Sequence, residues 1–163
     1  MNLKIATGIA LVAVASANPA FAQSADAGAG AEIIAPLEIS NTADLYFGTI
    51  APSTTVDDVV SVSADGSRKC GPALVCLTAD HTPAAFAVTG QDGASYTISL
   101  PGEIEITSAN GDRMKVSEFT GSKATGQLLN GLDDFTVGGT LAVAARQAAG
   151  KYRGAFTVTV EYK

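Results

Sequence analysis

Residues 152–162 read YRGAFTVTVEY, and this stretch decides the fold class. Five apolar or aromatic side chains share one parity, whereas threonine and glutamate occupy most of the positions between them. They are Tyr152, Phe156, Val158, Val160 and Tyr162. Successive side chains of an extended strand point to opposite faces, so the alternation predicts a last β-strand with one face in a core.

The same period of two runs through the chain that precedes this stretch. Runs at 33–40, 45–50, 59–63, 74–78, 84–89, 95–100, 103–107, 113–119, 134–137 and 140–144 are separated by turn residues. Asp-Gly at 65–66 and Asn-Gly at 110–111 are strong hairpin signals, and no convincing helical period occurs. The pattern predicts an all-β, immunoglobulin-like sandwich of 7–10 mostly antiparallel strands.

Two positions disturb this regular pattern. Phe119 has the opposite parity to Met114 and Val116, which predicts a bulge or a strand end there. Gly138-Gly139 interrupts an apolar run with no helix signal after it, so we interpret it as a bend or bulge and not as a phosphate-binding loop.

The composition excludes several classes of protein. The 163 residues contain 10 Lys and Arg against 16 Asp and Glu, and the cations are dispersed, so a nucleic-acid partner is not expected. At 47% hydrophobic and 16% charged, the chain is too apolar and too weakly charged for a disordered protein. The length suits a single domain.

The N-terminus resembles a secretory signal peptide. Lys4 supplies the positive charge, residues 5–17 are apolar, and Ala20-Phe21-Ala22 fits a cleavage site after Ala22. The apolar run is shorter than the roughly 20 residues that a membrane-spanning helix needs. We therefore predict residues 1–22 as signal peptide, 23–31 as an extension and 32–163 as the sandwich domain, in the periplasm or at the surface of a Gram-negative bacterium.

The two cysteines are expected to pair if the chain is exported. Cys70 and Cys76 are an even pair with five residues between them, which is neither a redox CxxC nor a zinc-site spacing. We predict a disulfide that staples one hairpin or loop.

No pattern of catalytic or metal-binding residues is evident. The single histidine, His81, lies in a polar loop, and no G-x-S-x-G sequence occurs. The acidic pairs Asp57-Asp58 and Asp133-Asp134 do not match a calcium-binding loop and are interpreted as solvated turn acids. We expect no enzyme activity, no metal and no cofactor.

Several segments resemble a family of bacterial exported proteins described as domain of unknown function 4402. They are Pro36-Leu37 with 45–50, 86–90 with 96–98, 137–141, and 149–162. The order and spacing of these segments carry the resemblance, which covers residues 32–163.

The C-terminal piece is also similar to the last strand of chaperone–usher pilins of the spore-coat-protein-U and archaic type. Gly150, Tyr152 and the penultimate Tyr162 fit that pattern. Such pilins are incomplete immunoglobulin-like sandwiches, and their missing strand is supplied by a chaperone and then by the N-terminal extension of the next subunit. The resemblance implies assembly with identical or related subunits and a periplasmic chaperone and usher.

The extension offers a candidate donor strand for such assembly. Ala25, Ala27, Ala29, Ala31 and Ile33 share one parity, so an extended chain would place them on one face. Donor strands usually carry larger apolar side chains than alanine. A self-contained periplasmic or secreted binding module with a flexible Ala/Gly-rich tail is therefore the alternative to a pilus-like subunit.

Overall fold

A computed structural model describes residues 23–163 of the chain. The predicted signal peptide, residues 1–22, lies outside the described residues. Residues 23–32 are exposed and contain neither helix nor strand. Ile33–Lys163 forms a separate compact unit.

Within the described part of the chain, the compact unit contains thirteen strands and no helix. In chain order they are β1 (Glu38–Ala43), β2 (Ile50–Ala51), β3 (Asp58–Val62), β4 (Arg68–Cys70), β5 (Val75–Cys76), β6 (Ala84–Thr89), β7 (Ser95–Ser99), β8 (Glu103–Ser108), β9 (Arg113–Gly121), β10 (Thr125–Gln127), β11 (Leu132–Val143), β12 (Tyr152–Arg153) and β13 (Thr159–Tyr162). Eight of the thirteen are four residues or longer. The predicted all-β class is confirmed.

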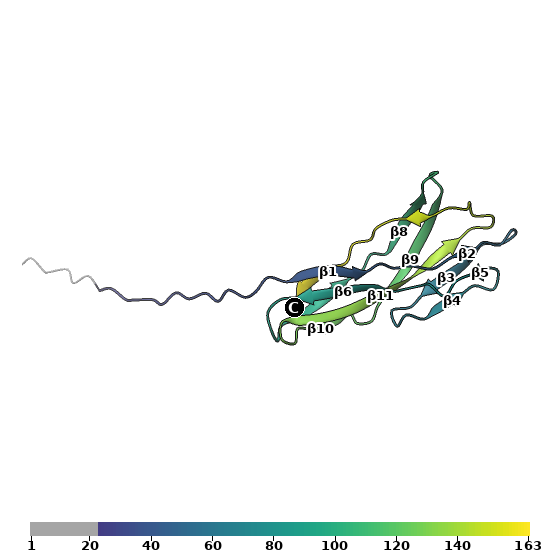
Figure 1. The fold of residues 1–163 in the computed structure, drawn as a ribbon. Coiled ribbons are helices and arrows are strands. Elements are labelled where there is room, and N and C mark those ends of the chain that lie inside the picture. The colour runs from purple at the N-terminus through teal and green to yellow at the C-terminus, as the bar shows by residue number, and fades with distance from the viewer. Residues whose placement is uncertain (1–22) are drawn as a thin grey trace, which may run out of the picture. The chain divides into compact units, whose positions relative to one another are not determined.

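The strands form one large sheet and two small ones, and all of their pairs are antiparallel (Figure 1). The large sheet has the order β1-β6-β11-β9-β8-β12, with β3 joined to β11 and β4 joined to β3. The small sheets are β10-β7-β13 and β2-β5. Together they make a β-sandwich.

Two clusters of buried side chains form the core of the sandwich. In the first, Phe86 and Phe135 of the large sheet stack at a centroid distance of 5.3 Å, and Tyr96 of β7 lies in the same cluster. The second contains Val60, Val116 and Leu141 of the large sheet. The alternation predicted for β6, β7 and β11 is confirmed, because their inward side chains are buried.

Strand β11 is continuous through Gly138-Gly139, so the two runs predicted at 134–137 and 140–144 form one strand. The bulge predicted at these glycines is confirmed, because the register of β11 against β9 shifts between Gly138 and Thr140. One edge of β11 pairs with β6 over 132–137 and then with β3 over 139–143. A Cβ on Gly138 would collide with the carbonyl oxygen of Val62, so these glycines let the three strands approach closely. The extra residue of this bulge lies in β9, where Glu118 has a φ of +52°, so the bulge predicted at Phe119 is also confirmed, and the Phe119 side chain packs against the core.

Several other strand boundaries differ from prediction. β1 starts five residues after Ile33, because Pro36 restricts the chain before it. The strand predicted at 45–50 is reduced to an isolated bridge at Tyr46 and the two residues of β2. The strand predicted at 74–78 is reduced to the two residues of β5. The short strands β4 and β10 have too little alternation to be recognised in the sequence.

The last stretch is divided, contrary to the prediction of one strand over 152–162. Tyr152 and Arg153 pair with β8 of the large sheet, whereas Thr159–Tyr162 pairs with β7 of the small sheet. The chain crosses between the sheets over Gly154–Val158. At Gly154 it still lies close to β8, since a Cβ there would be 2.8 Å from the carbonyl oxygen of Glu105. The parity is nevertheless as predicted, since Val158 is buried and the threonines beside it are exposed.

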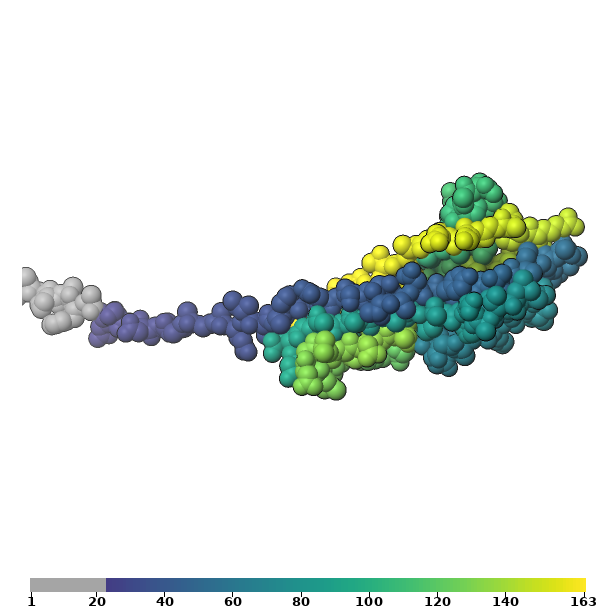
Figure 2. All heavy atoms as spheres, viewed as in Figure 1, coloured from purple at the N-terminus to yellow at the C-terminus, as the bar shows by residue number. Residues whose placement is uncertain are grey.

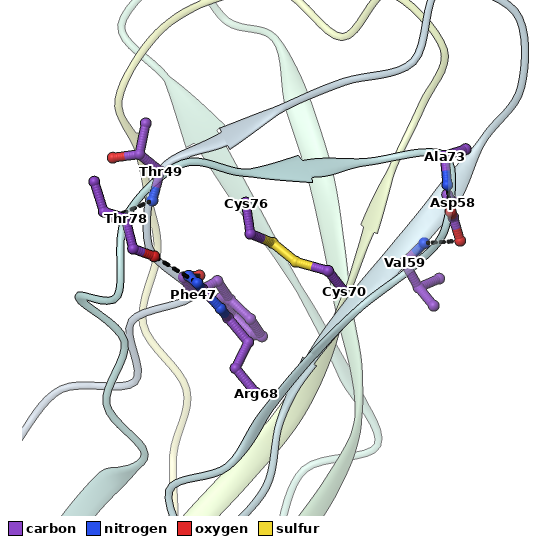
Figure 3. The surroundings of a disulfide bond; sticks show 9 residues. All are labelled: Phe47, Thr49, Asp58, Val59, Arg68, Cys70, Ala73, Cys76 and Thr78. Atoms are coloured by element: carbon purple, nitrogen blue, oxygen red, sulfur yellow. Dashed lines mark hydrogen bonds between the residues drawn. A yellow bond between two sulfur atoms is a disulfide. The ribbon is translucent and has the colours of Figure 1, made fainter.

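Cys70 and Cys76 form a disulfide, in agreement with the predicted pairing (Figure 3). Their Cα atoms are 6.5 Å apart, and the bond joins β4 of the large sheet to β5 of the two-stranded sheet. Beneath this loop the Asp58 carboxylate accepts the N–H groups of Val59 and Ala73 at 2.8 and 2.7 Å. Asp58 is therefore a structural acceptor and not a solvated turn acid. Asp57 also accepts a backbone N–H, that of Ala145 at 2.7 Å, but it is exposed, as expected of a solvated acid.

Replacing both cysteines by serine (Cys70→Ser with Cys76→Ser) is expected to lower the free energy of unfolding by about 2.4 kcal/mol, the loop-closure estimate for so short a ring. Urea titration measures the loss. Reduced wild-type protein is the control and should match the double variant. An unchanged midpoint in both would show that the loop is held by Asp58 alone.

The substitution Gly138→Ala is expected to cost about 3 kcal/mol, because the new methyl group meets the backbone of β3. Gly102→Ala is the matched control, since no atom lies within 4 Å of its added Cβ. The control should stay within about 0.5 kcal/mol of wild type. Equal stabilities of the two variants, measured by urea titration, would contradict the close approach at Gly138.

Candidate functional site

The most unusual feature of the sandwich is a gap in strand pairing beside its C-terminal segment. Within residues 23–163, Gly154–Val158 takes part in no strand pair, although the strands before and after it do. β1 pairs with β6 along one edge, and its other edge has no strand partner among the described residues. We call these two unpaired edges, β1 and Gly154–Val158, the open seam.

The two sides of the open seam converge at β13, the strand that follows Gly154–Val158, and the strands β1 and β12 run in opposite directions. β1 contacts β13, and Figure 2 shows the yellow C-terminal segment running beside the blue segment that contains β1. The pairings through β6, β11, β9, β8 and β12 are all antiparallel, which makes β12 antiparallel to β1. A strand added between them would be antiparallel to one side and parallel to the other.

Apolar side chains from both sides of the open seam are only half-buried. Leu37 and Ile39 come from the β1 side, and Phe156 comes from Gly154–Val158. Val160 and Tyr162 belong to the adjoining strand β13. All five pack against the first core cluster. The seam therefore combines unpaired backbone with partly exposed apolar side chains, which is the surface that an added β-strand recognises.

Aromatic rings fill the space beneath the C-terminal side of the seam. Phe156 lies 4.8 Å from Phe119 and 6.3 Å from Phe86, measured between ring centroids. The bulge in β9 turns Phe119 inward and so makes this cluster possible. Phe156 is only half-buried, so part of this aromatic cluster is exposed at the seam.

One end of the open seam is fixed by the hydroxyl group of Tyr162. This hydroxyl donates to the carbonyl oxygen of Ala35 at 2.8 Å and accepts the N–H of Gln91 at 2.8 Å. The Gln91 side chain in turn accepts the N–H of Ala35 at 3.3 Å. A Cβ on Gly90 would collide with the Tyr162 hydroxyl, so this position requires glycine. Sequence reasoning placed Tyr162 in the core but missed its role as an anchor for Ala35.

The predicted site residues are distributed between these features. The C-terminal residues Phe156, Val158, Val160 and Tyr162 gather at the first core cluster, whereas Tyr152 donates its hydroxyl to the carbonyl oxygen of Ala148 at 2.7 Å and lies outside that cluster. The predicted donor residues Ala25, Ala27, Ala29 and Ala31 are exposed and belong to no strand, and Ile33 is 95% exposed. Their role as a donor strand stays a prediction.

A second candidate site is an open cavity of about 510 Å³ whose lining includes Lys123, Gly126 and Asp133. The Asp133 carboxylate accepts the Tyr96 hydroxyl at 2.9 Å and pairs with the Lys123 ammonium at 2.8 Å. A Cβ on Gly126 would collide with Tyr96 and Asp133. The charged groups thus satisfy one another, and Asp133 is a structural acceptor and not a solvated turn acid.

The environment shifts the pKa of both acidic partners. Burial, followed by the hydrogen bond to Asp133, raises the pKa of Tyr96 far above its ordinary value. Burial alone would raise the pKa of Asp133. Hydrogen bonds from Lys123, Tyr96 and the Asp134 N–H outweigh that effect, so the pKa of Asp133 lies below its ordinary value.

The lowered pKa of Asp133 makes its contribution to stability depend on pH. The ionised carboxylate stabilises the fold above the unfolded pKa, about 3.9, and this contribution is lost as the pH falls through the lower folded pKa. Asp133→Asn is expected to cost about 1–3 kcal/mol at pH 7 and progressively less below pH 4. The exposed neighbour provides the control, Asp134→Asn. Parallel stability curves for Asp133→Asn and wild type from pH 7 to pH 2 would refute the assignment.

The polar residues singled out earlier are separated from one another. His81 approaches the carbonyl oxygen of Gly66 through Nε2 at 3.1 Å. Among the described residues, no three His, Cys, Asp or Glu side chains gather in a group that could hold a metal ion. In this part of the chain, no helix is long and apolar enough to cross a membrane.

Comparison with protein families identifies the domain that carries the open seam. The family described as domain of unknown function (DUF4402) matches residues 37–162, which span β1 to the end of β13. Comparisons with curated proteins and with solved structures found no match. On the extent of the family match, the chain belongs to the domain of unknown function 4402 family.

Proposed function

We propose that this protein is a non-enzymatic exported structural protein, a pilus-like or surface-fibre subunit that assembles by β-strand addition. The observation that carries the proposal is the open seam, where the unpaired Gly154–Val158 segment leads into β13, and β13 contacts β1, whose outer edge is unpaired. In this assembly the N-terminal segment of another copy occupies the seam. The partners are identical or related subunits, with a chaperone and usher before assembly.

Strand addition is favoured at this place for two physical reasons. An unpaired strand edge presents N–H and C=O groups that another chain can pair with. Backbone hydrogen bonds then supply affinity, while alternate side chains cover the half-buried Leu37, Ile39 and Phe156. Five residues span about 17 Å of strand, and the 14 residues from Gln23 to Pro36 reach about 46 Å when extended.

The alanine stripe (Ala25, Ala27, Ala29 and Ala31) has side chains of a size that this seam can accept. The rings of Phe156, Phe119 and Phe86 already occupy the space beneath the C-terminal side. A donor with methyl groups can lie over these rings without displacing them. A donor with larger side chains would meet the overpacking penalty of a filled core.

Export is supported by the N-terminal pattern and by the disulfide. Residues 1–22 have the charge, apolar run and small-residue site of a signal peptide. Disulfides such as Cys70–Cys76 persist in oxidising compartments. We therefore place the protein in the periplasm or at the cell surface.

The alternative function is a self-contained periplasmic or secreted binding module that does not polymerise. It is favoured by the complete burial of side chains such as Tyr96, Leu128 and Phe135, because both core clusters close without an added strand. In this case the open seam stays unoccupied and the loops carry the binding surface.

The oligomeric state separates the two functions. Protein that begins at Gln23 is expected to form concentration-dependent oligomers. Protein that lacks residues 23–32 keeps the compact unit Ile33–Lys163 but loses the alanines of the donor strand, so it is expected to be monomeric. Light scattering behind a sizing column measures both masses. Equal monomers from the two proteins would overturn the proposal and favour the binding module.

A charge on the stripe tests the donor face itself. Ala29→Asp would place a carboxylate against apolar side chains, so it is expected to weaken oligomers by at least tenfold. Gly28→Asp has the opposite parity and is the matched control, with nearly unchanged assembly. Equal weakening by both variants would contradict a seated strand with one buried face.

A further inference from the structure

Two exposed leucines flank a tight turn at the end of the domain where Ala35 is anchored. Leu129 and Leu132 exchange backbone hydrogen bonds of 3.0 and 3.2 Å across Asn130 and Gly131, whose φ angles are 56° and 74°. These angles identify a two-residue type I′ hairpin, which requires no apolar flanks. Leu129 is nevertheless 67% exposed and Leu132 is 60% exposed. We call these four residues the leucine hairpin.

A continuous series of contacts joins the leucine hairpin to the anchor of Ala35. Gly90 donates its N–H to the carbonyl oxygen of Gly131 at 3.1 Å. The next residue, Gln91, donates to the Tyr162 hydroxyl, which in turn donates to the carbonyl oxygen of Ala35. The hairpin and the anchor therefore share one end of the sandwich, the end marked C in Figure 1.

The proposed donor strand ends only two residues before this anchor. If Ile33 is seated in the seam of another copy, its Cα lies at most about 7 Å from that of Ala35. Ile34, the residue between them, is 48% exposed and apolar. So short a connection leaves no room for a flexible spacer, and the neighbouring copy must touch the end of the domain that carries the leucine hairpin.

We infer that the leucine hairpin is a contact surface for the neighbouring copy, and that Leu129 and Leu132 become buried there when the donor strand is seated. This inference rests on the proposed assembly by strand addition and adds a second interface to it. The partner is another copy of this chain, which would present an apolar surface where its seam receives Ile33. Burial of two leucines adds to the stability of the junction, beyond what the donor strand provides.

The test compares assembly of wild-type protein, from Gln23 onward, with that of a double variant, Leu129→Ser with Leu132→Ser. Both side chains are exposed in the single domain, so the variant should keep the thermal midpoint of its monomer. Tyr46→Ser is the matched control, because Tyr46 is 50% exposed and forms its bridge with Thr82, away from this end. The oligomer midpoint is measured by light scattering over a dilution series.

The expected result is a midpoint at least tenfold higher in concentration for the double variant, with the control unchanged. If wild type and the double variant share one midpoint, the leucine hairpin is not an interface, although assembly by strand addition still stands. If wild-type protein stays monomeric at every concentration, the proposed function fails and this inference fails with it.

Discussion

The close approach of backbone at Gly138 is the constraint on which the sandwich depends. One edge of β11 pairs first with β6 and then with β3, and the change of partner falls at this glycine. The carbonyl oxygen of Val62 occupies the place that a side chain would need. Because β11 also pairs with β9 along its other edge, this single strand connects the two core clusters. Paired strands connect both sides of the open seam to β11: β6 lies between β11 and β1, and β9 and β8 lie between β11 and β12.

The fold class follows from local pattern, whereas the candidate site follows from long-range pairing. Alternation and turn residues suffice to predict β6, β7 and β8 closely, since each strand shows its period within its own few residues. The inward turn of Phe119 was also predictable from a change of parity. In contrast, the gap at Gly154–Val158 depends on which strands lie beside it, so a regular run such as GAFTV gives no sign of being unpaired.

The errors at the glycines have the same origin. Gly138-Gly139 was expected to form a bulge between two separate runs; the bulge is present, but the two runs are one strand. In the folded protein the absence of a side chain admits a neighbouring strand, so the same residues allow the longest strand of the structure. Gly90 and Gly126 likewise leave room for the Tyr162 hydroxyl and for the Tyr96–Asp133 pair. Such roles depend on contacts with residues far away in the sequence.

The hydrogen bond between Tyr162 and Ala35 joins residues 127 positions apart. Tyr162 is synthesised 127 residues after Ala35, so these two residues cannot meet until all the strands between them have been made. β13, which completes the small sheet by pairing with β7, also follows all the other described strands in the chain. Folding that relies on such distant pairings is slow. The domain therefore stays open for longer after its synthesis than a fold built from local contacts would.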